Sequence, residues 1–121
     1  MLNKKYLSEL FGTLGLLSVI TGSGIMGENL GHGNDAITLL GNSIATGAGL
    51  YVLITLLGPI SGAHFNPLVS VMAYKQKQLK QKDLLPYIVS QMIGAVIGVW
   101  VTHLMFHLPI IQASSKMRTG L

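Results

Sequence analysis

The stretch that decides the fold is "SGAHFNPLVS", residues 61–70, a polar and proline-containing segment between two long apolar runs. Asn66 followed by Pro67 is typical of a helix start, because the Asn side chain caps free backbone N–H groups and Pro fits the first helical position. The lysine-rich segment "KQKQLKQKD", residues 75–83, interrupts this helix after Tyr74. The sequence therefore predicts a helix of about 8 residues and about 12 Å, roughly half of a bilayer.

The short helix lies between apolar segments that are long enough to cross a membrane. Of the residues, 50% are hydrophobic and 10% are charged, whereas a typical soluble domain has about 25% charged residues. A transmembrane helix needs about 20 apolar residues. We therefore predict an all-α membrane protein with three transmembrane helices and one re-entrant half-helix. The predicted single unit covers residues 1–121, with spans near 6–27, 36–58 and 83–107 and the re-entrant loop and half-helix near 59–75.

The first apolar stretch is interpreted as a retained span and not as a cleaved secretory signal, because two more segments of similar character follow it. The half-helix starts at depth and ends at the surface where the second span ended, so the loop before it lies within the membrane. Irregular backbone survives at that depth only where it is buried in protein or lines a watery cavity. The expected location is the cell (inner) membrane, with several passes through it.

Basic residues flank the predicted spans. Because loops rich in Lys and Arg stay in the cytoplasm, we place the start of the chain inside and the far end of the third span outside. Basic side chains beside membrane segments also touch anionic lipid headgroups, and no aromatic residues are interleaved with them to stack on bases. Membrane lipid is therefore an expected partner and nucleic acid is not. The residues predicted inside are Lys4, Lys5, Lys75, Lys77, Lys80 and Lys82, and those predicted outside are Lys116 and Arg118.

The sequence offers no set of residues for metal or cofactor chemistry. It has no cysteine, which excludes disulfides and thiolate metal sites. His103 and His107 have the i, i+4 spacing of metal ligands, but no third ligand is near them in sequence. No nucleophile, base and acid can be assembled into a catalytic site. We therefore expect no cofactor, no metal and no enzymatic activity.

Three segments occur in a fixed order along the chain: "SELFGT" at residues 8–13, "SGAHFNPLVS" at 61–70 and "QMIGAVIG" at 91–98. They resemble the start of the first helix, the first signature loop and the third helix of the aquaporins and glycerol facilitators, the major intrinsic protein family. Within that family, "TGSGIMGENL" at 21–30 resembles a bacterial aquaglyceroporin branch associated with arsenic-resistance operons. Members have two inverted halves in one polypeptide, so the resemblance implies half of an aquaporin fold.

The resemblance also implies roles for residues of the signature loop. The backbone carbonyls of Gly62, Ala63 and His64 would face the pore as hydrogen-bond acceptors, and the Asn66 amide would donate to a passing water. The half-helix that starts at Pro67 would point its positive end, equivalent to about +0.5 charge, at the same place. Cations and protons would be repelled there, whereas neutral solutes would meet only hydrogen-bonding groups.

Three further residues bear on selectivity through the same resemblance. The family's narrow filter commonly has an aromatic residue on the second span and an arginine after the second signature loop, and the matching positions here hold Thr46 and Val69. A pore made from two copies of this chain would be wider and less polar than a strict water channel, which favours glycerol and undissociated metalloid acids. Leu68 stands where the family usually has alanine, and it either packs between two half-helices or narrows the pore.

Glu9 lies in an apolar span, where an ionisable residue is a functional candidate by default. The resemblance implies that it supports the signature loop through hydrogen bonds, and the alternatives are proton transfer or a solvated position at the interface. Gly94 and Gly98 form a GxxxG pair, an ordinary device for close helix packing in membranes. These residues are expected to hold the fold and not to line a pore.

We expect a passive channel for water and small neutral solutes, with the pore completed by a second, inverted half. That half is either an inverted copy of this chain, as an antiparallel homodimer within a tetramer of pores, or a complementary half from another protein. The alternative function is a non-conducting or heteromeric partner subunit derived from a split or truncated aquaporin. A small dual-topology transporter would leave the Asn-Pro loop without a role.

Overall fold

Asparagine side chains begin three of the four helices in the described part of the chain. Asn3 accepts a hydrogen bond from the Lys5 N–H, Asn34 from the N–H groups of Ala36 and Ile37, and Asn66 from the Leu68 N–H. Each cap satisfies N–H groups that have no partner within the first turn of a helix. The resulting helices are α1 (Lys4–Leu30), α2 (Asp35–Ser61), α3 (Pro67–Lys75) and α4 (Gln81–Met105).

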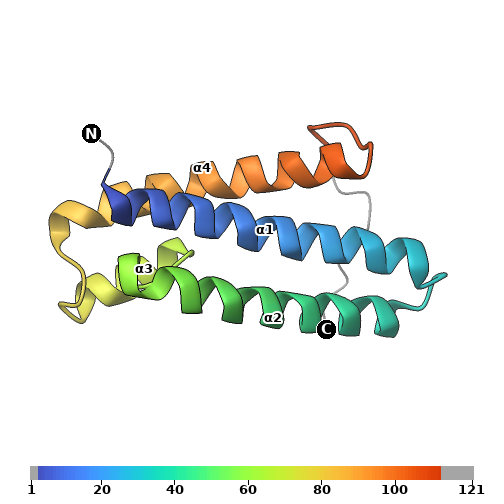
Figure 1. Ribbon diagram of the computed structural model, residues 1–121, viewed down its shortest axis with the longest axis horizontal. Coiled ribbons are helices and arrows are strands. Elements are labelled where there is room, and N and C mark those ends of the chain that lie inside the picture. Colours follow the sequence, from blue (N-terminus) through green and yellow to red (C-terminus); the bar gives the residue numbers. More distant parts are fainter. Residues whose placement is uncertain (1–2, 113–121) are drawn as a thin grey trace.

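The computed structural model describes residues 3–112 (Figure 1). Within this range all regular structure is helical, and α1, α2 and α4 are each long and apolar enough to cross a membrane. The predicted all-α class with three long apolar helices and one short helix is confirmed. The predicted positions of Lys116 and Arg118 lie outside the described residues.

The end of α2 differs from the predicted boundary near residue 58. The helix continues through Pro59 to Ser61. Membrane helices tolerate an internal proline where neighbouring helices, hydroxyl side chains or small local adjustments satisfy the backbone groups that it frees. Gly62 ends the helix with a φ of 89°, and its N–H donates to the Gly58 carbonyl over 2.8 Å. A left-handed residue at this position is a common helix terminator.

Helix α1 lies between α2 and α4 and packs along both, whereas the backbones of α2 and α4 do not approach each other closely within residues 3–112 (Figure 1). The start of α1, the end of α2 and the start of α4 lie at one end of the bundle, which we call the basic end because Lys4, Lys5, Lys75, Lys77, Lys80 and Lys82 are found there. Helix α3 lies at this end and packs on α4.

The α1–α4 crossing is close because two glycines of α4 face the backbone of α1. A Cβ atom at Gly94 would overlap the Leu10 carbonyl, and one at Gly98 would overlap the Leu14 carbonyl. The Ser18 hydroxyl donates to the Gly98 carbonyl over 3.1 Å across the same crossing. Small residues let helix backbones approach in lipid, where packing and interhelical hydrogen bonds hold helices together.

The interior of the molecule is mostly polar and its outside is mostly apolar. Only four hydrophobic residues are buried among the described ones: Phe65, Ala73, Leu79 and Tyr87. The buried polar and charged residues are Ser8, Glu9, Thr13, Ser61, Ser70, Asp83, Gln91, Thr102 and His103. Large apolar side chains are exposed along all four helices, which suits contact with lipid or with further helices and not with water.

Candidate functional site

Glu9 is fully buried and holds the loop between α2 and α3. Its Oε1 accepts hydrogen bonds from Ser61 Oγ (2.7 Å) and the His64 N–H (3.0 Å), and its Oε2 accepts from the Phe65 N–H (2.7 Å) and Gln91 Nε2 (2.9 Å). Four donors surround one carboxylate, so a buried acidic group is satisfied without an ion pair in these contacts. The sequence-predicted supporting residue therefore contacts the loop backbone directly.

Ser70 and Gln91 fasten the short helix α3 to α4. Gln91 Nε2 donates to Ser70 Oγ over 2.9 Å, and the same hydroxyl lies 3.0 Å from His64 Nδ1. Both Ser70 and Gln91 are almost completely buried. We call Glu9, Ser61, Ser70 and Gln91 the loop brace, since each of them bonds the loop or the half-helix to the rest of the bundle.

Tyr87 extends this network toward the basic end. Its hydroxyl donates to the Ser61 carbonyl over 2.7 Å, and its ring lies 5.2 Å, centroid to centroid, from the His64 ring. The Tyr6 ring meets the Tyr87 ring edge on at 6.0 Å, and the Tyr6 hydroxyl donates to Asp83 Oδ1 over 2.6 Å. The loop is thus linked through α4 to the first turn of α1.

The loop backbone adopts conformations that L-amino acids rarely take. The φ angles are 89° at Gly62, 53° at Ala63 and 52° at Phe65. Left-handed backbone costs energy at non-glycine residues and persists where surrounding contacts impose it. The Glu9 carboxylate imposes it here by binding the N–H groups of His64 and Phe65. The carbonyl oxygens of Gly62, Ala63 and His64 accept no hydrogen bond from residues 3–112.

The buried Phe65 side chain packs the loop against α1. Its side chain is 4% exposed, and its ring fills the space beside Gly12, where any Cβ atom would collide with it. Sequence reasoning missed Phe65 together with Ser61, Ser70, Gln91 and Tyr87. A signal was present for Gln91, because a polar amide inside an apolar span needs a partner, but neither local spacing nor composition identifies that partner as Glu9.

The half-helix has one buried face and one open face. Ser70 and Ala73 are 0% and 6% exposed on the side that meets α4, whereas Leu68 is 70%, Val69 45% and Met72 47% exposed. Asn66 is also exposed at the start of this helix. Pro67 occupies the first helical position, as its pairing with Asn66 predicts. We call Asn66, Leu68, Val69 and Met72 the open face.

Thr46 is not brought next to Val69. The Thr46 hydroxyl donates to Asn42 Oδ1 within α2 over 3.3 Å, and the backbones of α2 and α3 do not approach each other closely in the described residues. Gly94 and Gly98 are found at the α1–α4 crossing, away from the open face. His103 Nδ1 lies 2.9 Å from the Ile110 carbonyl, and residues 3–112 contain no cluster of three or more side chains suited to a metal ion.

The loop, its brace and the surrounding helices can be compared with known proteins. Residues 1–119 match the sequence model of the family described as Major intrinsic protein. This chain belongs to the major intrinsic protein family. With its three long apolar helices, this member of the family is a multi-pass membrane protein.

Three relatives illustrate the similarity. Aquaglyceroporin AqpS of Rhizobium meliloti (strain 1021) is 45% identical over 119 residues, which is 98% of this chain and 51% of that protein. Aquaporin NIP1-2 of Arabidopsis thaliana is 34% identical over 113 residues, 93% of this chain and 37% of the relative. Aquaporin Z of Rhodopseudomonas palustris (strain ATCC BAA-98 / CGA009) is 33% identical over 96 residues, 79% and 39% respectively. The chain thus spans about half the length of these relatives, or less.

Proposed function

We propose that this chain forms one half of a passive transmembrane channel for water and small neutral solutes, and that a second, inverted half completes the pore. The observation that carries the proposal is the half-helix α3. Its N-terminal end is capped by Asn66, the end is exposed on one side, and the loop brace holds the preceding backbone in a fixed conformation. The names of the relatives, aquaporin and aquaglyceroporin, point to the same activity.

The unpaired loop carbonyls support a wet pore at this site. The oxygens of Gly62, Ala63 and His64 accept no hydrogen bond from residues 3–112, and an unsatisfied polar group in hydrocarbon costs several kcal/mol. Water molecules or hydroxylated solutes passing in single file would donate hydrogen bonds to these carbonyl oxygens one after another. The positive end of α3, equivalent to about +0.5 charge, would repel cations and protons at the same place.

The open face supports a second half. Leu68, Val69 and Met72 are exposed beside the polar start of α3, so lipid on this face would bring hydrocarbon next to unsatisfied backbone groups. An inverted half would place its own half-helix there and exclude lipid. We propose that this half is a second copy of the chain, as an antiparallel homodimer, with four such pores in a tetramer. A complementary half from another protein is the competing arrangement.

The proposed selectivity includes solutes larger than water. The positions that match the family's filter hold Thr46 and Val69, and neither supplies an aromatic ring or a fixed cation. A constriction made from two such sets is wide and weakly polar, which favours glycerol and undissociated metalloid acids. The name of the relative aquaglyceroporin AqpS is in keeping with glycerol as one solute.

Stopped-flow light scattering on liposomes that contain only this chain tests the channel. Osmotic shrinkage several-fold faster than in empty vesicles, followed by re-swelling in a glycerol gradient, is the expected result. Asn66→Asp places a negative charge at the proposed constriction and should lower solute flux and admit cations. Asn34→Asp changes another asparagine helix cap, at the far end of the bundle, and should leave both quantities unchanged.

Shrinkage no faster than in empty vesicles would reject the self-sufficient channel and favour a non-conducting or heteromeric partner subunit. Dual insertion is tested separately. Gln78 is exposed at the basic end and the chain has no native cysteine, so Gln78→Cys provides one unique label. Labelling from both sides of the membrane in intact cells is expected for an antiparallel homodimer. Labelling from one side alone would reject the homodimer and leave the complementary half.

A further inference from the structure

The directions of the hydrogen bonds in the loop brace follow from Glu9. Its carboxylate oxygens accept from four donors, so the Gln91 atom that lies 2.9 Å from Oε2 must be the amide nitrogen. A reversed amide would set the Gln91 oxygen against a carboxylate oxygen, and two acceptors repel each other. The carboxylate therefore fixes which way the Gln91 amide points.

Ser70 transmits this orientation to His64. Gln91 Nε2 has two hydrogens, one for Glu9 Oε2 and one for Ser70 Oγ, so the Ser70 hydroxyl accepts from Gln91 and has its own hydrogen to donate. Serine hydroxyls in helices often donate to a carbonyl one turn back, as that of Ser23 does over 2.6 Å. Ser70 makes no such bond within residues 3–112 and is 0% exposed. Its hydrogen is therefore directed at His64 Nδ1, 3.0 Å away.

The hydrogen of the neutral His64 ring is then carried by the other ring nitrogen. Neutral imidazole has one N–H and one acceptor nitrogen, and Nδ1 is the acceptor, so Nε2 is the donor. The buried side-chain polar atoms without a partner in residues 3–112 are Thr13 Oγ1 and Gln91 Oε1. His64 Nε2 is not one of them and has no hydrogen-bond acceptor in that range, so this N–H is accessible.

The accessible N–H lies beside the loop carbonyls. His64 Nε2 is 3.2 Å from the position that a Cβ atom on Gly62 would take. The ring cannot turn freely, because the Tyr87 ring lies 5.2 Å from it and the His64 backbone N–H is bound to Glu9 over 3.0 Å. A donor that is already oriented loses little freedom when a solute binds.

We propose that Glu9, acting through Gln91 and Ser70, fixes His64 as the Nε2–H tautomer, and that this N–H is a solute-contacting donor of the pore. One hydroxyl group both donates and accepts. A solute hydroxyl can therefore donate to a loop carbonyl and accept from Nε2–H at the same place. The contact with solute rests on the proposed channel function, whereas the tautomer does not.

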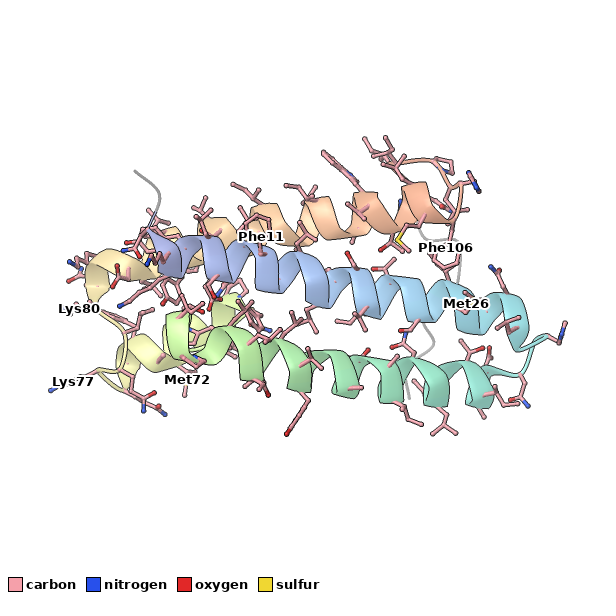
Figure 2. All side chains as sticks on the ribbon, in the orientation of Figure 1. Phe11, Met26, Met72, Lys77, Lys80 and Phe106 are labelled. Carbon is pink, nitrogen blue, oxygen red and sulfur yellow. The ribbon has the colours of Figure 1, made fainter. Side chains whose placement is uncertain are left out.

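His103 supplies a comparison within the same chain. Its Nδ1 lies 2.9 Å from the Ile110 carbonyl, which can only accept, so Nδ1 carries the hydrogen of the neutral ring. His103 precedes Phe106 by three residues, and Figure 2 shows Phe106 at the end of the bundle opposite to Lys77 and Lys80. The hydrogen bonds thus give these two histidines opposite tautomers.

Heteronuclear NMR of the full chain, labelled at histidine and held in detergent micelles at alkaline pH, tests the tautomers. We expect hydrogen on Nε2 of His64 and on Nδ1 of His103, each signal assigned by its loss in the corresponding Gln variant. Ser70→Ala removes the donor to His64 Nδ1 and should let both His64 tautomers appear. Ser43→Ala, at an exposed serine of α2, should leave them unchanged. Hydrogen on His64 Nδ1 in the unaltered chain, or identical His64 signals in Ser70→Ala, would overturn the proposal.

Glycerol flux into liposomes tests the solute contact. The double variant His64→Phe with Ser70→Ala removes both partners of one hydrogen bond and keeps a ring beside Tyr87. Its glycerol flux should fall roughly threefold to tenfold, the effect of one lost hydrogen bond. Ser70→Ala alone should lower the flux by about twofold at most, because part of the rings keep hydrogen on Nε2.

The flux measurement separates this inference from the channel itself. Unchanged glycerol flux in the double variant, beside a conducting unaltered chain, would overturn the role of His64 as a donor. If the double variant loses its helical circular dichroism, the twofold comparison with Ser70→Ala decides in its place. If the unaltered chain does not conduct, the proposed channel fails, and the NMR spectra still decide the tautomer.

Discussion

Helices α2 and α4 both pack on α1, but the residues at the two interfaces differ in kind. Along α4, Gln91, Gly94 and Gly98 are buried where α4 meets α1 and Glu9. In α2, Ser61 is the single buried residue. Asn42 of α2 donates to the Ile20 carbonyl over 3.1 Å, which is one of few polar contacts on that side. The α1–α4 side is complete within this chain, whereas α2 keeps most of its surface for lipid or further helices.

The largest expected effect comes from removing the carboxylate at the centre of the α1–α4 side. Glu9→Ala leaves two loop N–H groups, Ser61 and Gln91 without their common acceptor, at about 1–3 kcal/mol for each buried donor. We expect a loss of at least about 3 kcal/mol in unfolding free energy, measured by denaturation in detergent micelles. Thr55→Val removes an exposed hydroxyl of α2 and should change little. Similar unfolding free energies for both variants would refute the proposed difference between the α1–α4 and α1–α2 interfaces.

The second effect compares two glycines with opposite surroundings. Gly94→Ala pushes a methyl group into the Leu10 carbonyl, and overpacking of this kind costs about 1–3 kcal/mol. Gly47 of α2 has open space around it, so Gly47→Ala should be neutral or stabilising by up to about 1 kcal/mol through helix propensity. Thermal unfolding of both variants is the measurement. Equal destabilisation would show that α2 is as tightly packed as α4.

A third and smaller effect is expected at the junction of α3 with α4. Ser70→Ala leaves Gln91 Nε2 with only Glu9 as acceptor and removes the hydroxyl beside His64 Nδ1. The expected loss of unfolding free energy is about 1–2 kcal/mol. In this variant, backbone hydrogen exchange in residues 67–75 should be accelerated, relative to the unaltered protein, more than exchange in α1. Unchanged exchange in α3 would mean that its apolar contacts alone hold it.

The smallest effect on the chain itself is expected on the open face. Leu68 is 70% exposed, so Leu68→Ala should change its unfolding free energy by no more than about 0.5 kcal/mol. The variant separates two interpretations of this residue. If Leu68 packs between half-helices, cross-linking of copies should fall. If it narrows the pore, glycerol flux should rise while cross-linking stays the same.

The elements of this fold follow from local chemistry and could be predicted. Asn66 and Pro67 start α3 because capping and a fixed φ act within two residues. Apolar length identified α1, α2 and α4 in the same way. The predicted second span ends near residue 58, whereas α2 continues through Pro59 to Ser61 and ends at the left-handed Gly62.

The loop brace could not be predicted beyond Glu9. Ser61 and Gln91 meet this carboxylate from positions 52 and 82 residues away, and no local pattern specifies which polar groups of separate apolar helices become neighbours. The left-handed conformations of Ala63 and Phe65 could not be predicted from the sequence either, because they exist only where the Glu9 carboxylate draws the loop N–H groups toward α1.

The sequence alone predicts the membrane helices, their starts and the position of the half-helix, because hydrophobic length and capping depend on neighbours along the chain. The arrangement of donors around one buried acid, and the division of α3 into a bonded face and an open one, required the folded molecule. Those properties depend on which helix lies against which, and that is set by the close approach that Gly94 and Gly98 permit between α1 and α4.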